Sequence, residues 1–175
     1  MSMTTMGAGR SGATTKTTED SPMDELLFQQ ESEAPLFVTD INDEVKRFFA
    51  RHPERLHDLA PRKFEILIAD ILKDLGFETQ LTQATRDGGR DIYAFIRNAA
   101  TSFLMFVECK KWKDNVGIEI VQRLHGTCTI NNADKGMIVT TSFFTEPAKA
   151  EHKKIATKME LVDFTKFKDW LMRYK

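Results

Sequence analysis

Residues 103–111 read FLMFVECKK, an apolar run that ends in an acid and two bases. Side chains of a strand alternate between its two faces, so Leu104 and Phe106 share one face with Glu108 and Lys110. A run that is apolar on both faces is typical of a central, buried strand. Burying the charged pair at its end is costly unless each charge has a partner. The stretch therefore predicts the middle of a sheet and a polar site at its end.

The flanking sequence predicts the other elements of an α/β fold by its hydrophobic periodicity. Helices are expected over 41–59 with an interruption at Pro53, from 61 to 75 with Gly76 as the stop, over 116–131, from 146 after a Thr145 cap, and over 166–173. Strands are expected over 77–82, 91–97, 103–111, 136–141 and 161–164. This order predicts an α/β sandwich whose mixed sheet begins as an antiparallel meander and continues with parallel crossovers.

Composition limits the class of protein. The 175 residues include 41% hydrophobic residues, and 25 Lys and Arg oppose 26 Asp and Glu, for a formal net charge of -1. This balance argues against a nucleic-acid binder that works through a basic tail. No run approaches the ~18–20 apolar residues that span a bilayer, and the N-terminus lacks the pattern of a secretion signal. With only two cysteines and no disulfide framework, we expect a cytoplasmic protein with no membrane partner.

The charge divides the chain into unequal parts. Residues 1–34 contain two cations and six anions and are rich in Thr, Ser, Gly and Met, so we expect a disordered acidic tail and linker that is free to dock a protein partner. Residues 35–60 are expected to form a short helical lead-in, and residues 61–175 the core of the fold. Without the tail the body carries a formal net charge of +3, which is mildly basic.

A second polar stretch, DGGRDI over 87–92, places Asp91 at the start of the strand before 103–111. A divalent cation between Asp91 and Glu108 would give both buried carboxylates a partner, and Mg²⁺ prefers such oxygen ligands. Such an ion would lower the pKa of a bound water, and Lys110 would hold or deprotonate that nucleophile. The alternative is a buried structural ion pair.

The motif D91…E108-x-K110 resembles the PD-(D/E)xK nuclease core, and more narrowly the Mrr-like restriction endonuclease family. The matching text is PRKFEILIADILKDLGF, TRDGGRDIYAF, VECKKW, VGIEIVQRLHG and KGMIVTTSFFTEPAKA, within residues 53–175. The resemblance implies a restriction-endonuclease-like three-layer α/β/α sandwich. It also implies that Asp91, Glu108 and the backbone carbonyl of Cys109 bind the metal, and that Lys110 is the catalytic lysine. Arg90 stands where the eponymous proline would be, and the Mrr-like branch commonly shows Gly-x-Asp there, the pattern of Gly89-Arg90-Asp91.

Two further positions match the family less specifically. Glu65, on the helix over 61–75, corresponds to an auxiliary acid near the metal, and a solvated helix flank is an equally good explanation. Gln122 matches the glutamine on the helix after the ExK strand, with ordinary surface polarity as its rival. Six residues near the site are candidates for DNA contacts: Arg90, Lys111, Lys113, Arg123, Thr141 and Ser142. Solvated edges, capping and turn chemistry explain each of these alone about as well.

The resemblance implies a Mg²⁺-dependent endodeoxyribonuclease, with Mn²⁺ as a substitute, that leaves a 5′-phosphate and a 3′-hydroxyl in DNA restriction, defence or processing. Cutting both strands with one site per chain suggests a homodimer. A DNA-binding or assembly subunit that keeps the fold without cleaving is the alternative from another class. A structure-specific nuclease of the Holliday-junction type is the alternative among nucleases.

Overall fold

The computed structural model describes residues 41–83 and 90–175, which belong to one compact unit. The predictions for residues 1–34 therefore lie outside the described residues, as do residues 87–89 of the DGGRDI stretch. In the part of the chain that the structure describes, no helix is both long and apolar enough to cross a bilayer.

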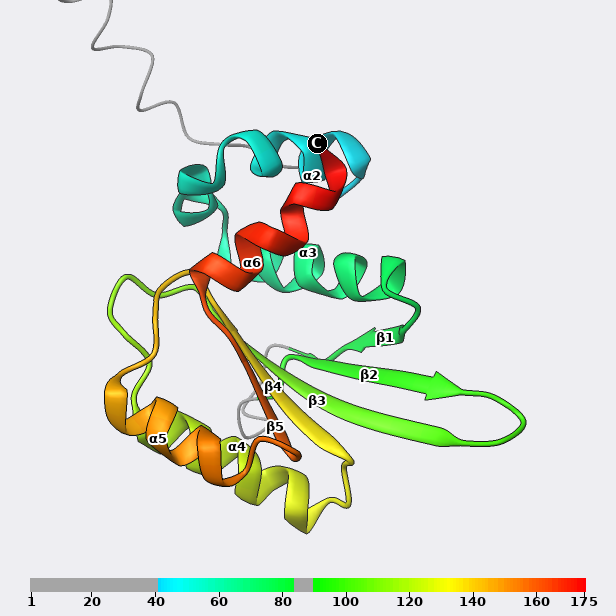
Figure 1. Ribbon diagram of the computed structural model, residues 1–175. Coiled ribbons are helices and arrows are strands. Elements are labelled where there is room, and N and C mark those ends of the chain that lie inside the picture. The colour runs from blue at the N-terminus through cyan, green and yellow to red at the C-terminus, as the bar shows by residue number, and fades with distance from the viewer. Residues whose placement is uncertain (1–40, 84–89) are drawn as a thin grey trace, which may run out of the picture. The chain divides into compact units, whose positions relative to one another are not determined.

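A five-stranded mixed sheet forms the centre of the molecule, as predicted (Figure 1). Its strands follow the order of the chain: β1 (Glu78–Leu81), β2 (Ile92–Arg97), β3 (Ser102–Lys110), β4 (Lys135–Thr140) and β5 (Met159–Val162). The pairs β1–β2 and β2–β3 are antiparallel, whereas β3–β4 and β4–β5 are parallel. The strand that contains Glu108 is the central one.

Helices cover both faces of this sheet and complete three layers (Figure 1). On one face, Met105 and Val107 of β3 join a buried cluster with α3 (Pro61–Asp74) and α6 (Phe164–Leu171). On the other, Phe106 joins a second cluster with α4 (Ile118–Ile130) and α5 (Glu146–Lys154). The alternation read from residues 103–111 is confirmed, and it places Glu108 on the α4 side.

The lead-in helices pack into the first of these clusters. They are α2 (Asp43–Arg51) and the 3₁₀ helix η1 (Pro53–Asp58), which begins at the proline that the sequence marked as an interruption. Phe49 and Leu56 are fully buried against the α3 side. Residues 41–60 therefore contribute to the same core as α3.

The last strand and helix begin earlier than predicted. The sequence predicted a strand over 161–164 and a helix from 166, but β5 is Met159–Val162 and α6 starts at Phe164. Asp163 causes the shift, because its carboxylate accepts a hydrogen bond from the Lys166 amide at 3.0 Å and caps the helix. The chain ends in a 3₁₀ helix, η2 (Met172–Tyr174).

Candidate active site

The start of β2 and the end of β3 bring Asp91 beside Glu108. Asp91 precedes β2, and its amide donates to the Val107 carbonyl at 2.9 Å, which extends the antiparallel ladder by one bond. Its Oδ2 accepts from the Cys109 amide at 2.6 Å. Backbone pairing alone therefore fixes the first carboxylate against the strand that carries the second. The Cys109 backbone, the third ligand implied by the resemblance, lies in the same place.

Glu108 is the most buried acid of the site. Its side chain is 0% exposed, and its Oε1 contacts both Lys110 Nζ, at 2.7 Å, and the Arg123 guanidinium from α4. Its other oxygen, Oε2, is buried without a hydrogen-bond partner among the described residues. An unsatisfied buried carboxylate oxygen carries a desolvation cost of ~1–3 kcal/mol or more, so this atom is an open acceptor for a cation.

Lys110 lies between an acid and an aromatic ring. Its ammonium is 2.7 Å from Glu108 Oε1 and 5.0 Å from the centroid of the Trp112 ring, and the side chain is 18% exposed. A cation over the face of an indole is attracted by the ring quadrupole. The two contacts hold the amine at the surface of the site, within reach of water.

The electrostatics of the site disfavour charge on Asp91. Burial raises the pKa of Asp91 from 3.8 to about 6, and the nearby Glu65 and Glu108 carboxylates add to the rise. The Cys109 amide and the Lys110 ammonium oppose the shift but do not cancel it. Such crowding of buried carboxylates is typical of a site that takes up a cation or a proton.

Glu65 of α3 is close enough to influence the pKa of Asp91, as its predicted auxiliary role requires. Its carboxylate also forms an ion pair with Arg62 Nη1 at 2.6 Å, one turn earlier on the same helix. The residue is thus neither a free ligand nor a solvated flank, since only 20% of its side chain is exposed.

On α4 both Gln122 and Arg123 are exposed, and Arg123 is the one whose guanidinium reaches Glu108. The Gln122 amide donates to Glu151 of α5 at 3.5 Å, so the structure does not bring it to the carboxylates. Consecutive helix residues point about 100° apart, so the two side chains leave α4 in different directions, Arg123 toward Glu108 and Gln122 toward α5. From the sequence, Arg123 was predicted only as a phosphate contact. Its position one residue after the motif glutamine was the signal that could have predicted its contact with Glu108.

The hydroxyls of Thr141 and Ser142 donate hydrogen bonds to backbone carbonyls. Both residues are buried, and they donate to the carbonyls of Trp112 at 2.9 Å and of Asp114 at 2.7 Å. These bonds hold the loop that follows β3. The structure thus shows the turn chemistry that was the alternative for these two hydroxyls, and their DNA contacts stay a prediction.

The remaining predicted DNA contacts differ in their surroundings. Lys111 donates to the His57 carbonyl at 2.5 Å and ties η1 to the loop after β3, while Lys113 is exposed. The Arg90 guanidinium lies 5.4 Å from the centroid of the Phe106 ring, on the Glu108 side of the sheet. Arg90 is thus partly exposed on the Glu108 side of the sheet, Lys113 is an exposed lysine of the loop after β3, and Lys111 supports the fold.

The donor set suits a hard divalent cation. Among residues 41–83 and 90–175, no three His, Cys, Asp or Glu side chains are arranged to hold a metal by themselves. Asp91, Glu108 and one backbone carbonyl would leave the other positions to water or substrate oxygens, as Mg²⁺ prefers. The open Oε2 of Glu108 supports this fit.

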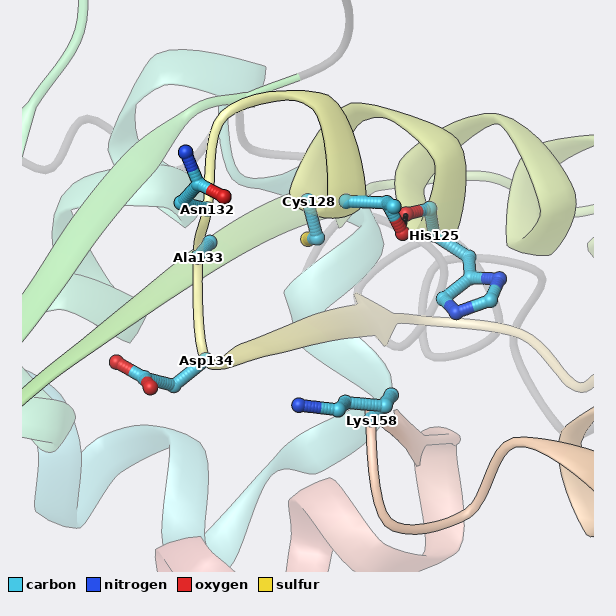
Figure 2. Close-up of a pocket in the computed structure, with 7 residues that line it drawn as sticks. His125, Cys128, Asn132, Ala133, Asp134 and Lys158 are labelled. Carbon is cyan, nitrogen blue, oxygen red and sulfur yellow. Dashed lines mark hydrogen bonds between the residues drawn. The ribbon is translucent and has the colours of Figure 1, made fainter.

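A separate cavity of ≈ 330 Å³ lies at the other end of β3 (Figure 2). Its lining comes from the end of α4 and the turn into β4, and includes His125, Cys128 and Asp134. Asp134 accepts a hydrogen bond from the Leu104 amide at 2.8 Å. Leu104 is four residues before Glu108 on β3, which corresponds to a distance of ~13 Å along the strand. This cavity is not part of the carboxylate site.

Comparison with known proteins connects this geometry to an enzyme family. The Mrr catalytic-domain family, described as restriction endonuclease, matches residues 56–171. The type IV methyl-directed restriction enzyme EcoKMrr of Escherichia coli K12 is 30% identical over 101 residues, covering 55% of this chain and 33% of the relative. An uncharacterized protein of Sinorhizobium fredii, y4cE, is 28% identical over 128 residues, covering 72% and 33%. The chain thus spans about a third of the curated relatives that it matches.

Two solved structures share the fold. The DNA modification-dependent restriction endonuclease AspBHI superimposes with a TM-score of 0.56 at 20% identity, over 90% of this chain and 46% of that one. The MspJI restriction endonuclease, solved with a 27-mer oligonucleotide, gives a TM-score of 0.56 at 17% identity, over 79% and 35%. The predicted restriction-endonuclease-like three-layer sandwich is confirmed.

Proposed function

The chain belongs to the Mrr-type restriction endonuclease family, and on this basis we propose that it is a divalent-metal-dependent endodeoxyribonuclease. One observation carries the proposal. Asp91, Glu108 and Lys110 converge at one edge of the sheet, with a buried, open carboxylate oxygen on Glu108 and a raised pKa on Asp91. An arrangement built only for stability would pair that oxygen.

We propose that Asp91, Glu108 and the Cys109 carbonyl hold Mg²⁺, with Mn²⁺ as a substitute. When bound, the ion supplies a Lewis acid that stabilises the negative charge developing on the phosphate. Glu65 adds negative charge near Asp91 and so favours cation uptake. Enzymes of the PD-(D/E)xK type generally use a divalent metal, which supports this assignment.

The reaction proposed is hydrolysis of a phosphodiester. A water oxygen bonds to phosphorus while the bond from phosphorus to O3′ breaks; the attacking water releases its proton to bulk water, and O3′ takes up a proton from bulk water. The products are a 5′-phosphate and a 3′-hydroxyl. Lys110, held by Glu108 and Trp112, is placed to hold the water and to offset charge in the transition state. Arg123 neutralises Glu108 on the α4 side.

We propose a role in DNA restriction or defence, and the name of the relative EcoKMrr, a methyl-directed restriction enzyme, supports it. We propose DNA as the substrate and a homodimer as the form that cuts both strands, because each chain contributes one site. A protein partner for the acidic residues 1–34 is a further proposal from charge alone.

The test is cleavage of plasmid, linear and four-way-junction DNA with Mg²⁺, with Mn²⁺ or with EDTA. Asp91→Asn, Glu108→Gln and Lys110→Met should each lower metal-dependent cleavage at least ~100-fold, since each removes a group that acts on the reacting phosphate. Lys153→Met, which removes an exposed lysine from α5, should cleave like the wild type.

Metal-dependent cleavage that persists in both Asp91→Asn and Lys110→Met would overturn the assigned site. Salt-sensitive DNA binding with no cleavage of any substrate would instead favour a non-cleaving binding subunit. Cleavage confined to the four-way junction would favour the structure-specific nuclease.

A further inference from the structure

A row of aromatic and arginine side chains continues from Asp91 along β2. Asp91, Tyr93, Phe95 and Arg97 are two residues apart in sequence, so they share one face of the strand. The Tyr93 ring lies 5.2 Å from that of Phe106, a member of the α4-side cluster. The row is therefore on the same side of the sheet as Glu108.

Residues 41–83 and 90–175 give this part of the sheet little cover. On the α4 side, the buried core residues of the described chain come from β3, β4, β5, α4, α5 and the connecting loops, and none comes from β1 or β2. On the opposite face of β2, Ile92 and Ala94 are 0% exposed beneath α3. Figure 1 shows the β2–β3 hairpin extending past α4 and α5. Tyr93 and Phe95 remain partly exposed as a result.

Both ends of the row carry a guanidinium stacked on a ring. The Arg97 Cζ lies 4.8 Å from the centroid of Phe95, and the Arg90 Cζ lies 5.9 Å from that of Tyr93. At an exposed site such a stack contributes only ~0.5–1 kcal/mol, so its main effect is to orient the planar group. An oriented guanidinium presents N–H donors in a fork that matches phosphate.

Charge on the face is mixed: the acids are Asp91 and Glu78, the cations are Arg90 and Arg97, and Arg97 is the cation at the end far from the carboxylate site. Glu78 of β1 is exposed and pairs with Phe95 across the two strands. Its negative charge partly offsets the positive charge of Arg90 and Arg97. Gln80, the next β1 residue on this face, pairs with Tyr93 and is neutral. Arg97 forms no ion pair with a residue that the structure describes.

We propose that this β2 face, made by Tyr93, Phe95 and Arg97, binds the phosphate backbone of the DNA that flanks the cleaved bond. The inference rests on the proposed nuclease function and extends its substrate contacts. From Asp91 to Arg97 the strand rises ~20 Å, at ~3.3 Å per residue. This distance equals about six base-pair steps of B-DNA. Arg97 is thus a phosphate contact far from the chemistry.

The experiment measures binding of a fluorescent 24-base-pair duplex to the full chain by anisotropy in Ca²⁺, at several salt concentrations. Arg97→Gln should weaken binding ~3–10-fold and reduce the slope of log Kobs against log salt by about 1, the loss of one phosphate contact. The affinity of Arg97→Lys should fall between that of wild type and that of Arg97→Gln, because lysine keeps the charge without the planar stack. Glu78→Gln should tighten binding.

The matched control is Arg47→Gln, which removes the same charge from an exposed position on α2. If Arg97→Gln and Arg47→Gln change the affinity and the salt slope equally, the proposed contact is overturned. If Arg97→Gln leaves DNA binding intact but lowers the mass measured by light scattering, the β2 face is an interface between two chains, and the proposal is likewise overturned.

Cleavage assays on the same preparations separate this inference from the function. If wild type cleaves, Asp91→Asn does not, and Arg97→Gln behaves like Arg47→Gln, the nuclease stands and the β2 contact fails. If wild type neither binds nor cleaves DNA, both fail.

Discussion

At the scale of single residues, the site depends on how three charges share a small buried volume. Within the described part of the chain, Glu108 has two cationic partners on one oxygen and none on the other, while the pKa of Asp91 rises to about 6 because it is buried beside other acids. The same crowding that makes the pair costly makes it receptive to a cation.

The first prediction concerns Asp91 and pH. The unfolded chain releases this proton near pH 3.8 and the folded chain near pH 6, so the stability present below pH 3.8 is lost as the pH rises through 6. The asparagine of Asp91→Asn does not ionise, so this variant removes the loss of stability at high pH, and its side-chain oxygen can still accept the hydrogen bond from the Cys109 amide. In EDTA at pH 7.5 the variant should melt about 3–6 °C above wild type.

The difference in Tm should shrink toward zero at pH 4, where Asp91 is protonated in the folded protein. Mn²⁺ should raise the Tm of wild type at pH 7.5 and leave that of Asp91→Asn unchanged. A variant that melts below wild type at pH 7.5 would contradict the raised pKa.

The second prediction concerns the contact of Arg123 with Glu108. Arg123→Met should lower the free energy of unfolding by about 1–2 kcal/mol, because Lys110 alone remains to compensate a fully buried carboxylate. The partly exposed guanidinium keeps the loss below that of a fully buried pair. In the Glu108→Gln background the same change should cost much less. Equal costs in the two backgrounds, measured by urea unfolding, would exclude the coupling.

At the scale of elements, the strands deliver the site and the helices cover it. β3 contributes Glu108 and Lys110 on one face and apolar residues on the other, so one strand both builds the core and carries the chemistry. Helix ends then fix the geometry, as with the Asp163 cap that starts α6 at Phe164.

The third prediction compares two glycines at helix positions. Gly76 follows α3 with φ +93°, a conformation that costs an L-residue ~1–2 kcal/mol, so Gly76→Ala should destabilise the protein by about 1 kcal/mol. Gly126 lies within α4, and an added Cβ would meet nothing within 4 Å. Gly126→Ala should therefore stabilise by ~0.5–1 kcal/mol. Chemical denaturation measures both, and shifts of the same sign would contradict this account.

At the scale of the whole molecule, a buried lysine joins the two ends of the described chain. Lys46 of α2 is 2% exposed, and its ammonium lies 2.7 Å from Asp70 and 2.5 Å from Asp74, both on α3. The Tyr174 hydroxyl donates to Asp74 at 2.6 Å. Burial alone would lower the pKa of Lys46, but the bonds to the two aspartates raise it above its usual value. The network ties the lead-in to α3 and η2.

The fourth prediction is that Lys46→Met lowers the free energy of unfolding by about 2 kcal/mol. In this variant Asp70 and Asp74 lose the ammonium that they share, and the partial exposure of both carboxylates to water limits the loss of stability. Lys73→Met is the matched control on the surface of α3 and should change stability by less than ~0.5 kcal/mol. Similar losses in the two variants would show that the buried network contributes little.

Sequence patterns predicted most of this fold because the patterns are local. The 3.6-residue period of residues 61–75 and the alternation of 103–111 report directly on which face is buried. Boundaries were less certain where a cap decides them, since Asp163 could belong to a strand or precede a helix until its side chain is placed. The motif D91…E108-x-K110 also identified the acids and the lysine that the structure brings together.

The sequence by itself determined the order of elements, the central strand and the three residues that meet at its end, since each follows from periodicity or motif spacing. Only the tertiary structure decided which cation reaches Glu108, that Thr141 and Ser142 bond to a loop, and that Lys46 is buried between two aspartates. These contacts join residues of different elements, and a side chain's partner depends on helix rotation and sheet packing. The tertiary structure alone also decided that, of the described helices, α4 and α5 do not bury the face of β2 beside Asp91.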